Sequence, residues 1–253
     1  MRSFRKIILG IVALAVSLSA QEIYATFNIE ADKSANLAFY SSGIIDKVYV
    51  DVASSVKRGD KLVELQNDDL KASLKIAKAK LAEAEVSLKF AKRDYDRQLL
   101  IKDLIDEAKF DQYELVYERA KVEVASAKAN LAYQQSLLDR SIILAPFDGV
   151  IFEKSVEVGD VVSGMMLRTI FKIQSKDKRK LIFEFDQKYW KKVKVGDSVK
   201  YSINGDNNSY TGKISKVYPH ANSDNRKIKA EVTANGFVVG LFGDGYIIVP
   251  DTK

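Results

Sequence analysis

The chain has 253 residues, 47% of them hydrophobic and 29% charged, a formal net charge of +6 and only three prolines. This is a globular composition, long enough for one large domain or for two or three small ones. The absence of cysteine excludes disulfides, thiol chemistry, cysteine-based metal sites and the lipid anchor of a bacterial lipoprotein, and the mild charge gives no support to nucleic-acid binding.

Residues 1–20 are predicted to be a secretory signal peptide. A basic start precedes an apolar run over 7–18, and small residues follow at Ser17, Ser19 and Ala20. The apolar run is about twelve residues long, which is short of the roughly twenty that span a bilayer. We therefore expect export, with an uncleaved N-terminal anchor as the alternative. Removal of Arg2, Arg5 and Lys6 lowers the net charge from +6 to about +3.

Two similar phrases lie about a hundred residues apart. The first begins at Gly43 and reads GIIDKVYVDVASSVKRGDKLVEL, and the second begins at Gly149 and reads GVIFEKSVEVGDVV. Alternation in the first phrase predicts a strand with Ile44, Val48 and Val50 on its apolar face. The Gly-Asp pairs at 59–60 and 159–160 predict tight turns, where Gly permits a positive φ. We expect the two phrases to be halves of one folded unit, a flattened barrel.

The segment between the two phrases predicts a helical hairpin. Residues 68–138 contain neither Gly nor Pro, and apolar residues recur there at alternating steps of four and three. One seam comprises Leu70, Leu74, Ala77, Leu81, Ala84, Leu88, Ala91 and Tyr95; the other comprises Phe110, Tyr113, Tyr117, Ala120, Val124, Ala127, Leu131 and Leu138. Two helices of some 33 residues extend roughly 50 Å. Polar outer faces favour a protruding rod over a helix pair packed within a larger core.

The ends of this rod are marked by polar residues. Asn67 or Asp68 is expected to cap the first helix by accepting its free N–H groups, and Ser141 opens the returning strand. After residue 175, short alternating runs, a VGD turn and an Asn/Gly/Asp-rich loop predict a small β-barrel. The stretch EIYATFNIE at 22–30 is expected to pair with this barrel, and GLFGDGYIIV at 240–249 to close it.

The phrases at Gly43 and Gly149, with the entry ILAPFDGVI at 143–151, resemble the split lipoyl (biotinyl) domain of periplasmic adaptor proteins, also called membrane fusion proteins. In that family a coiled-coil hairpin separates the two halves. The family pattern has Gly ten residues after the first Gly of each half; Gly159 matches it, whereas Ala53 departs from it. The junction at which true carriers present a modified lysine is the rod here, so no cofactor is expected.

The resulting fold class is α+β, mainly β, with a long antiparallel coiled-coil hairpin inserted in a lipoyl-like (barrel-sandwich hybrid) domain, plus a small β-barrel domain. The expected domains are a signal peptide at 1–20, a split lipoyl-like domain at 36–67 and 141–174, a hairpin at 68–140, and a barrel at 21–35 and 175–253. A membrane-proximal domain is expected to be minimal or absent.

The tip of the rod is the candidate partner site, because an exposed apolar cluster there has no core of its own. The resemblance implies that such tips bind a TolC-like outer-membrane channel through an Arg, a Leu and a Ser in fixed order. Leu99 matches the Leu position, and Asp106 replaces the Ser. The full candidate set is Arg93, Arg97, Leu99, Leu100, Ile101, Leu104, Ile105 and Asp106. The alternative is that the apolar residues only close the hairpin.

No catalytic constellation is found, so the chain is not expected to be an enzyme or to bind a metal or cofactor. The single histidine, His220, is interpreted as a loop residue. The resemblance implies an adaptor associated with the periplasmic side of the inner membrane. Its expected partners are an inner-membrane transporter, a TolC-like channel and further copies of itself in a ring, usually sixfold in the family.

The first hypothesis is a drug or metal efflux adaptor of a resistance-nodulation-division (RND) transporter. The second is an adaptor of an ATP-driven exporter, and the third is a lipoyl-like carrier, against which the signal peptide argues.

Overall fold

A computed structural model describes residues 20–166 and 168–250. The predicted signal peptide, apart from Ala20, lies outside the described residues. The chain forms two compact units: one combines the segment that ends at Asp32 with the segment that begins at Asp177, and the other is Lys33–Lys176. The first unit thus combines two segments that are distant in sequence, which β pairing holds together.

The first unit is a closed antiparallel barrel with the strand order β1-β10-β13-β12-β11-β14. Its strands are β1 (Ala20–Ala31), β10 (Lys178–Asp186), β11 (Ser198–Ile203), β12 (Ser209–Ala221), β13 (Lys227–Asn235) and β14 (Phe242–Pro250), and a short 3₁₀ helix, η2 (Gln187–Tyr189), follows β10. Pairing of β1 with both β10 and β14 confirms that the N-terminal stretch joins the barrel and that the last strand closes it.

The barrel interior follows the alternation of its strands, since every second side chain of a strand points to the same face. On β1 the residues Ile23, Phe27 and Ile29 are almost fully buried. The Phe27 ring contacts the Phe183 ring with centroids 4.7 Å apart and meets the Tyr201 ring edge-on at 5.3 Å. These apolar residues form one core that is separate from the core of the second unit.

The second unit contains two four-stranded sheets, of orders β2-β9-β7-β4 and β6-β5-β3-β8. The strands are β2 (Ser34–Leu37), β3 (Gly43–Val48), β4 (Ser55–Val56), β5 (Lys61–Leu65), β6 (Ile142–Leu144), β7 (Gly149–Lys154), β8 (Val161–Val162) and β9 (Phe171–Ser175). The halves exchange strands symmetrically, because Gly43 pairs with Val162 and Gly149 pairs with Val56. The two phrases are therefore halves of one fold, as predicted.

One predicted strand face is wrong. Ile45 is 1% exposed in the core whereas Ile44 is 40% exposed, the reverse of the predicted alternation. The register between β3 and β5 shifts between Ile45 and Lys47, and such a bulge inserts one residue and reverses the alternation beyond it. Past the bulge Val48 and Val50 pack against the core, as the sequence indicated.

The Gly-Asp turns take the predicted positive φ, 91° at Gly59 and 93° at Gly159, but they are not equivalent in the fold. Gly59 lies between β4 and β5, whereas Gly159 lies between β7 and β8. The partner of Gly159 in the other half is Ala53, with a φ of 68°. The Ala53 N–H donates to the Ile151 carbonyl at 2.8 Å, and the Gly159 N–H donates to the Ile45 carbonyl at 2.9 Å. The departure from the family pattern at Ala53 therefore leaves the turn unchanged.

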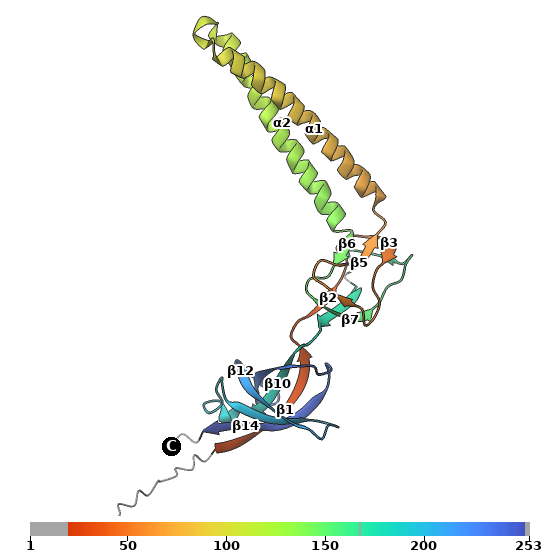
Figure 1. Cartoon of the computed structure of the whole chain (residues 1–253), viewed down its shortest axis with the longest axis vertical. Helices are drawn as coiled ribbons and strands as arrows, with labels where there is room; N and C mark the ends of the chain where they lie inside the picture. Colours follow the sequence, from red (N-terminus) through yellow and green to blue (C-terminus); the bar gives the residue numbers. More distant parts are fainter. Residues whose placement is uncertain (1–19, 167, 251–253) are drawn as a thin grey trace, which may run out of the picture. The chain divides into compact units, whose positions relative to one another are not determined.

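The hairpin consists of α1 (Asp68–Leu99), the 3₁₀ turn η1 (Lys102–Leu104) and α2 (Glu107–Asp139). Figure 1 shows the two helices side by side, continuing from β5 and leading into β6. Both predicted seams are confirmed: every seam residue is buried or half-buried, and Leu74, Ala77, Ala84, Phe110, Ala120 and Val124 are buried. At 1.5 Å per residue, the 32 residues of α1 extend roughly 48 Å.

The predicted side-chain cap at the start of α1 is wrong. Asn67 occupies the N-cap position, but its side chain makes no capping hydrogen bond. Its amide nitrogen instead donates to Glu64 Oε1 and to Ser141 Oγ, each at 3.0 Å. Ser141 Oγ in turn donates to the Leu138 carbonyl at 2.6 Å. The side chain of Asn67 therefore joins the two ends of the hairpin insertion instead of capping one helix.

Candidate functional site

The tip of the hairpin exposes apolar side chains to solvent. Leu100 is 86% exposed and Leu104 84% exposed, while Leu99 and Ile101 are 48% and 41% exposed. Leu99 is the last residue of α1, and Leu104 ends η1. Large apolar side chains this exposed gain nothing from the fold of the chain itself, which makes them candidates for contact with another protein.

An aromatic cluster beneath the tip closes the hairpin from inside. The Tyr95 ring lies 5.6 Å from the Phe110 ring and stacks on the Tyr117 ring at 5.1 Å. Phe110 is only 3% exposed, and the Lys102 ammonium lies 4.6 Å from the centre of its ring. Because these three rings fill the space between the helices, Leu100 and Leu104 are not needed to close it. The alternative that the whole apolar set only closes the hairpin therefore does not account for these two leucines.

The two candidate arginines lie on the exposed surface of α1. Arg93 Nε is 3.3 Å from Asp94 Oδ1, and its guanidinium carbon is 4.7 Å from the centre of the Phe90 ring. Arg97 contacts the same carboxylate more loosely, at 3.8 Å. Exposed pairs of this kind contribute little to stability, so both guanidinium groups are available to a partner.

Asp106 has a local structural role. It occupies the N-cap position of α2, and its side chain accepts a hydrogen bond from the Lys109 N–H at 3.3 Å. An aspartate there satisfies a free donor and favours the positive end of the helix dipole. Ile105, half-buried, is the C-cap residue of η1. The structure thus brings all eight predicted residues to one end of the hairpin, and their role in binding stays a prediction.

A cluster of hydrogen-bonded polar side chains around Glu64 lies at the base of the hairpin. Glu64 is buried on β5, where the Tyr49 hydroxyl donates to its Oε2 at 2.8 Å and Lys61 Nζ donates at 3.2 Å. Lys71 of α1 pairs with Oε1 at 3.7 Å. Burial acts to raise the pKa of Glu64, but hydrogen bonds from Asn67, Tyr49 and Lys61 outweigh it and lower the pKa to about 2. The carboxylate therefore stays ionised and holds strand and helix together.

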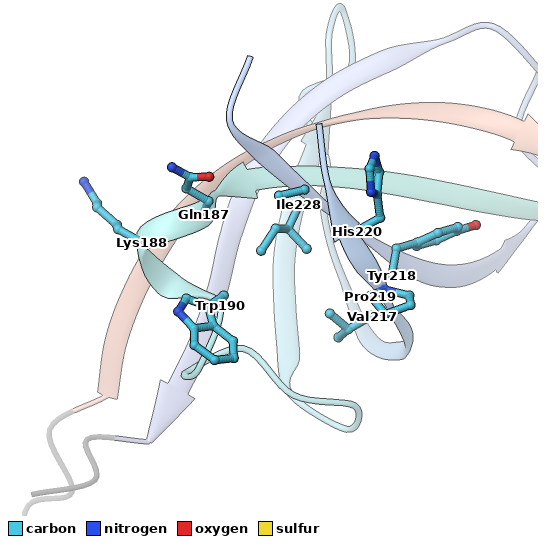
Figure 2. A pocket seen from close by; sticks show the side chains of 9 residues that line it. Gln187, Lys188, Trp190, Val217, Tyr218, Pro219, His220 and Ile228 are labelled. Carbon is cyan, nitrogen blue, oxygen red and sulfur yellow. The ribbon is translucent and has the colours of Figure 1, made fainter. Parts of the chain in front are cut away.

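A hollow of about 710 Å³ opens in the barrel unit between η2 and β12. Figure 2 shows Trp190 on one side, Pro219 and His220 of β12 on the other, and Ile228 between them. His220 lies in strand β12, so its interpretation as a loop residue is wrong. The register of β12 against β13 shifts between Val217 and Ala221. Because this irregular stretch contains Pro219, which has no N–H to donate, its sequence is typical of a loop.

Sequence reasoning missed the Glu64 group and the hollow at Trp190. The partners of Glu64 lie within residues 49–71, where pairing between β3 and β5 brings Tyr49 to it and the start of α1 brings Lys71. Only the pairing of β5 with β6 adds Ser141, which accepts a hydrogen bond from the Asn67 side chain. Within the described residues, no group of His, Cys, Asp or Glu side chains is arranged to hold a metal ion. None of the described helices has both the length and the apolar character needed to cross a membrane.

Known proteins share this architecture. The family described as "CzcB-like, barrel-sandwich hybrid domain" matches residues 33–174. The multidrug resistance protein MdtA of Escherichia coli (strain K12 / DH10B) is 33% identical over 110 residues, which cover 43% of this chain and 26% of MdtA. The matched stretch thus spans about a quarter of that curated relative.

Solved structures are similar over most of the chain. A MacA-MexA chimera with the Pseudomonas aeruginosa MexA α-hairpin domain has a TM-score of 0.68 and 26% identity, covering 90% of this chain and 81% of its own. MacA from Actinobacillus actinomycetemcomitans has a TM-score of 0.73 and 22% identity, covering 91% and 79%, which supports the fold. The chain belongs to the CzcB-like barrel-sandwich hybrid family, a family of membrane fusion proteins, or periplasmic adaptors.

Proposed function

We propose that this chain is the periplasmic adaptor subunit of a tripartite efflux pump, acting between an inner-membrane transporter and an outer-membrane channel. It catalyses no reaction. Several copies form a ring, and the hairpins together make the conduit through which the substrate crosses the periplasm. The similarity to MdtA, named a multidrug resistance protein, supports export of drugs or other toxic compounds.

The observation that carries this proposal is the exposed apolar tip. Leu100 and Leu104 are more than four-fifths exposed at the end of a two-helix rod that has its own internal closure. A rod of roughly 48 Å places this apolar surface far from its own base, where only another molecule can cover it. We therefore assign the channel contact to Leu99, Leu100, Ile101 and Leu104, with Arg93 and Arg97 at its edge.

The proposed transporter is of the RND type, as the sequence resemblance implies. An adaptor of an ATP-driven exporter would use the same tip and the same lipoyl-like unit. The RND and ATP-driven alternatives therefore predict the same binding surfaces on this chain, and they differ only in the transporter that is captured. A partner screen in the native cell is the appropriate test of both.

The test is photo-crosslinking in cells, with a photoreactive amino acid at Leu100 and, in a separate variant, at Tyr246, which is exposed on β14 of the barrel unit. Captured proteins are identified by mass spectrometry. The matched control carries the same amino acid at Lys128, an exposed position in the middle of α2. We expect an outer-membrane channel to be captured from Leu100 but not from Lys128, and an inner-membrane transporter from Tyr246.

Each outcome has a definite meaning. Capture of an RND protein supports the proposed transporter class, and capture of an ATPase replaces it with the alternative. Absence of any membrane protein at both positions, with the variants present at normal level, would contradict the adaptor function.

A further inference from the structure

We propose that the barrel unit binds the surface of a bilayer with anionic headgroups through the segment KYWKKVK, residues 188–194. Four of its seven residues are lysines, none is acidic, and it holds Trp190, the single tryptophan of the chain. The proposal rests on the proposed periplasmic location beside the inner membrane, and it concerns a different surface from the hairpin tip.

The segment is a helical turn with two different faces. The N–H groups of Lys192 and Val193 both donate to the Tyr189 carbonyl, at 2.9 and 3.2 Å. Tyr189 packs against the barrel core, and Val193, four residues later, is 4% exposed. Residues three or four apart share a helical face, so Trp190 and Lys191 are directed away from the core. The barrel holds the turn by one face and exposes the other.

Trp190 lacks the packing that is usual for an indole. It is 62% exposed and borders the 710 Å³ hollow instead of filling it, as Figure 2 shows. The Lys191 ammonium lies 5.1 Å from the centre of its ring. Tryptophan is enriched where membrane meets water, because its ring is apolar while its N–H can be hydrated. The exposed indole of Trp190, with the Lys191 ammonium beside it, is therefore suited to the headgroup layer of a bilayer.

Strand register places this segment at the barrel end where the chain enters. Ser198, which follows the segment, pairs with Ile248, and Ala20 pairs with Pro250. Lys192 Nζ also donates to Gln21 Oε1 at 2.6 Å, one residue after β1 begins. The apolar run 7–18 directly precedes this entry in the sequence. The lysines and Trp190 are therefore adjacent to the start of β1, where the described chain begins.

The charges at this end favour an anionic partner. Among the described residues near this end, the basic side chains include Lys188, Lys191, Lys192, Lys194, Arg226 and Lys227, and the acidic side chains include Glu22, Asp186, Asp197 and Asp224. Asp186 lies 3.8 Å from Lys188, and Asp197 accepts a hydrogen bond from the Lys194 N–H at 2.7 Å. Protein interfaces are depleted in lysine, whereas each lysine near an anionic bilayer adds attraction, so a lipid surface fits better than a protein surface.

The test uses the fluorescence of the full-length chain, in which any tryptophan signal comes from Trp190. We expect vesicles of phosphatidylglycerol mixed with phosphatidylcholine to shift the emission to shorter wavelength, and brominated acyl chains to quench it. Phosphatidylcholine alone should produce no such shift. High salt should reverse the binding, because it screens exposed charges.

The decisive comparison uses two triple variants with the same change in charge. Lys188→Gln, Lys191→Gln and Lys194→Gln together should lower partitioning into anionic vesicles on the order of 100-fold, since each lysine contributes about 1 kcal/mol. Lys75→Gln, Lys78→Gln and Lys80→Gln, exposed on α1, should leave it unchanged. The proposal is overturned if anionic vesicles leave the emission unchanged, if neutral vesicles shift it equally, or if both triple variants behave alike. None of these results affects capture of a channel at Leu100.

Discussion

Ala53 shows how a single residue can carry strain without changing the fold. Its φ of 68° is in the left-handed region, where the Cβ of an L-residue is crowded by the next carbonyl. The turn is nevertheless closed like that of Gly159, since the Ser54 N–H donates to the Asp51 carbonyl at 3.0 Å and the Ser54 hydroxyl accepts from the Asp51 N–H at 2.9 Å. The strand pairing on both sides imposes the turn on alanine.

Replacing Ala53 by glycine should stabilise the second unit by about 1 kcal/mol, because the left-handed penalty exceeds the entropy that glycine adds to the unfolded chain. The reciprocal control is Gly159→Ala. No atom lies within 4 Å of the added Cβ there, so any loss of about 1 kcal/mol comes from the backbone alone. Urea unfolding measures both changes. Stabilisation by both substitutions, or by neither, would contradict this account.

Glu64 couples the strands to the hairpin through its charge. Its pKa is about 2 in the fold against an ordinary value of 4.5, so the interaction is complete above about pH 4.5 and is lost as the pH falls toward 2. The difference corresponds to roughly 3 kcal/mol in the free energy of unfolding.

The variant Glu64→Gln should therefore be less stable than the native chain at pH 7 and should lose less stability between pH 5 and pH 3, since the amide does not titrate. Urea unfolding at these pH values measures the difference. Glu83→Gln, at an exposed position of α1, should behave like the native chain. An equal pH dependence for native and Glu64→Gln chains would show that another group controls acid unfolding.

In the hairpin, the residues that stabilise the fold are different from the residues proposed to bind a partner. Its seam is rich in alanine and half-buried leucine, so each turn contributes little, and the Tyr95, Phe110 and Tyr117 rings provide the largest buried contact near the tip. The leucines of the tip lie outside this contact. A substitution among the three rings should therefore weaken the folding of the hairpin tip. A substitution among the tip leucines should weaken binding and leave folding unchanged.

Phe110→Ala should destabilise the outer half of the hairpin by about 3 kcal/mol, the usual cost of emptying a buried aromatic position. Hydrogen exchange of peptides from the end of α1 and the start of α2 should accelerate. Leu104→Ser should leave exchange unchanged, since the side chain is 84% exposed, but should abolish capture of the channel at Leu100. Loss of capture without any change in exchange for both variants would contradict the structural role of Phe110.

In the whole molecule, the hairpin is an insertion into a fold that does not depend on it. The Leu65 N–H donates to the Ser141 carbonyl at 2.9 Å, and Asn67 bridges to Ser141, so the insertion leaves and re-enters at one point. The core of the lipoyl-like unit contains no residue of α1 or α2. Connections with close ends can be replaced without disturbing the core of a domain.

A chain in which residues 69–139 are replaced by a short glycine-rich linker should therefore remain folded. Circular dichroism should lose its helical signal and keep its β signal, and limited proteolysis should spare residues 33–67 and 141–176. Channel capture should be lost while vesicle binding is retained. Rapid proteolysis of the lipoyl-like unit would show that the hairpin is required for its folding.

Local patterns in the sequence were sufficient for the elements with a simple period. The two heptad seams, the strands of the barrel and the Gly-Asp turns depend on residues within a few positions of one another, so helix and turn geometry could be predicted directly. The exposed apolar tip also followed, because a break between two seams must leave its apolar residues at the end of the hairpin. Similarity between the two half-phrases predicted that they form one unit.

Contacts between distant segments decided the rest. The bulge after Ile45 reversed a strand face because its position depends on the partner strand β5, and the Asn67 side chain turned from capping to bridging because Ser141 lies beside it. The segment KYWKKVK is a candidate surface only because Tyr189 packs against the barrel core and Val193 is buried, which leaves Trp190 exposed. Such features depend on strand register, which is set by the whole barrel and not by any short stretch of sequence.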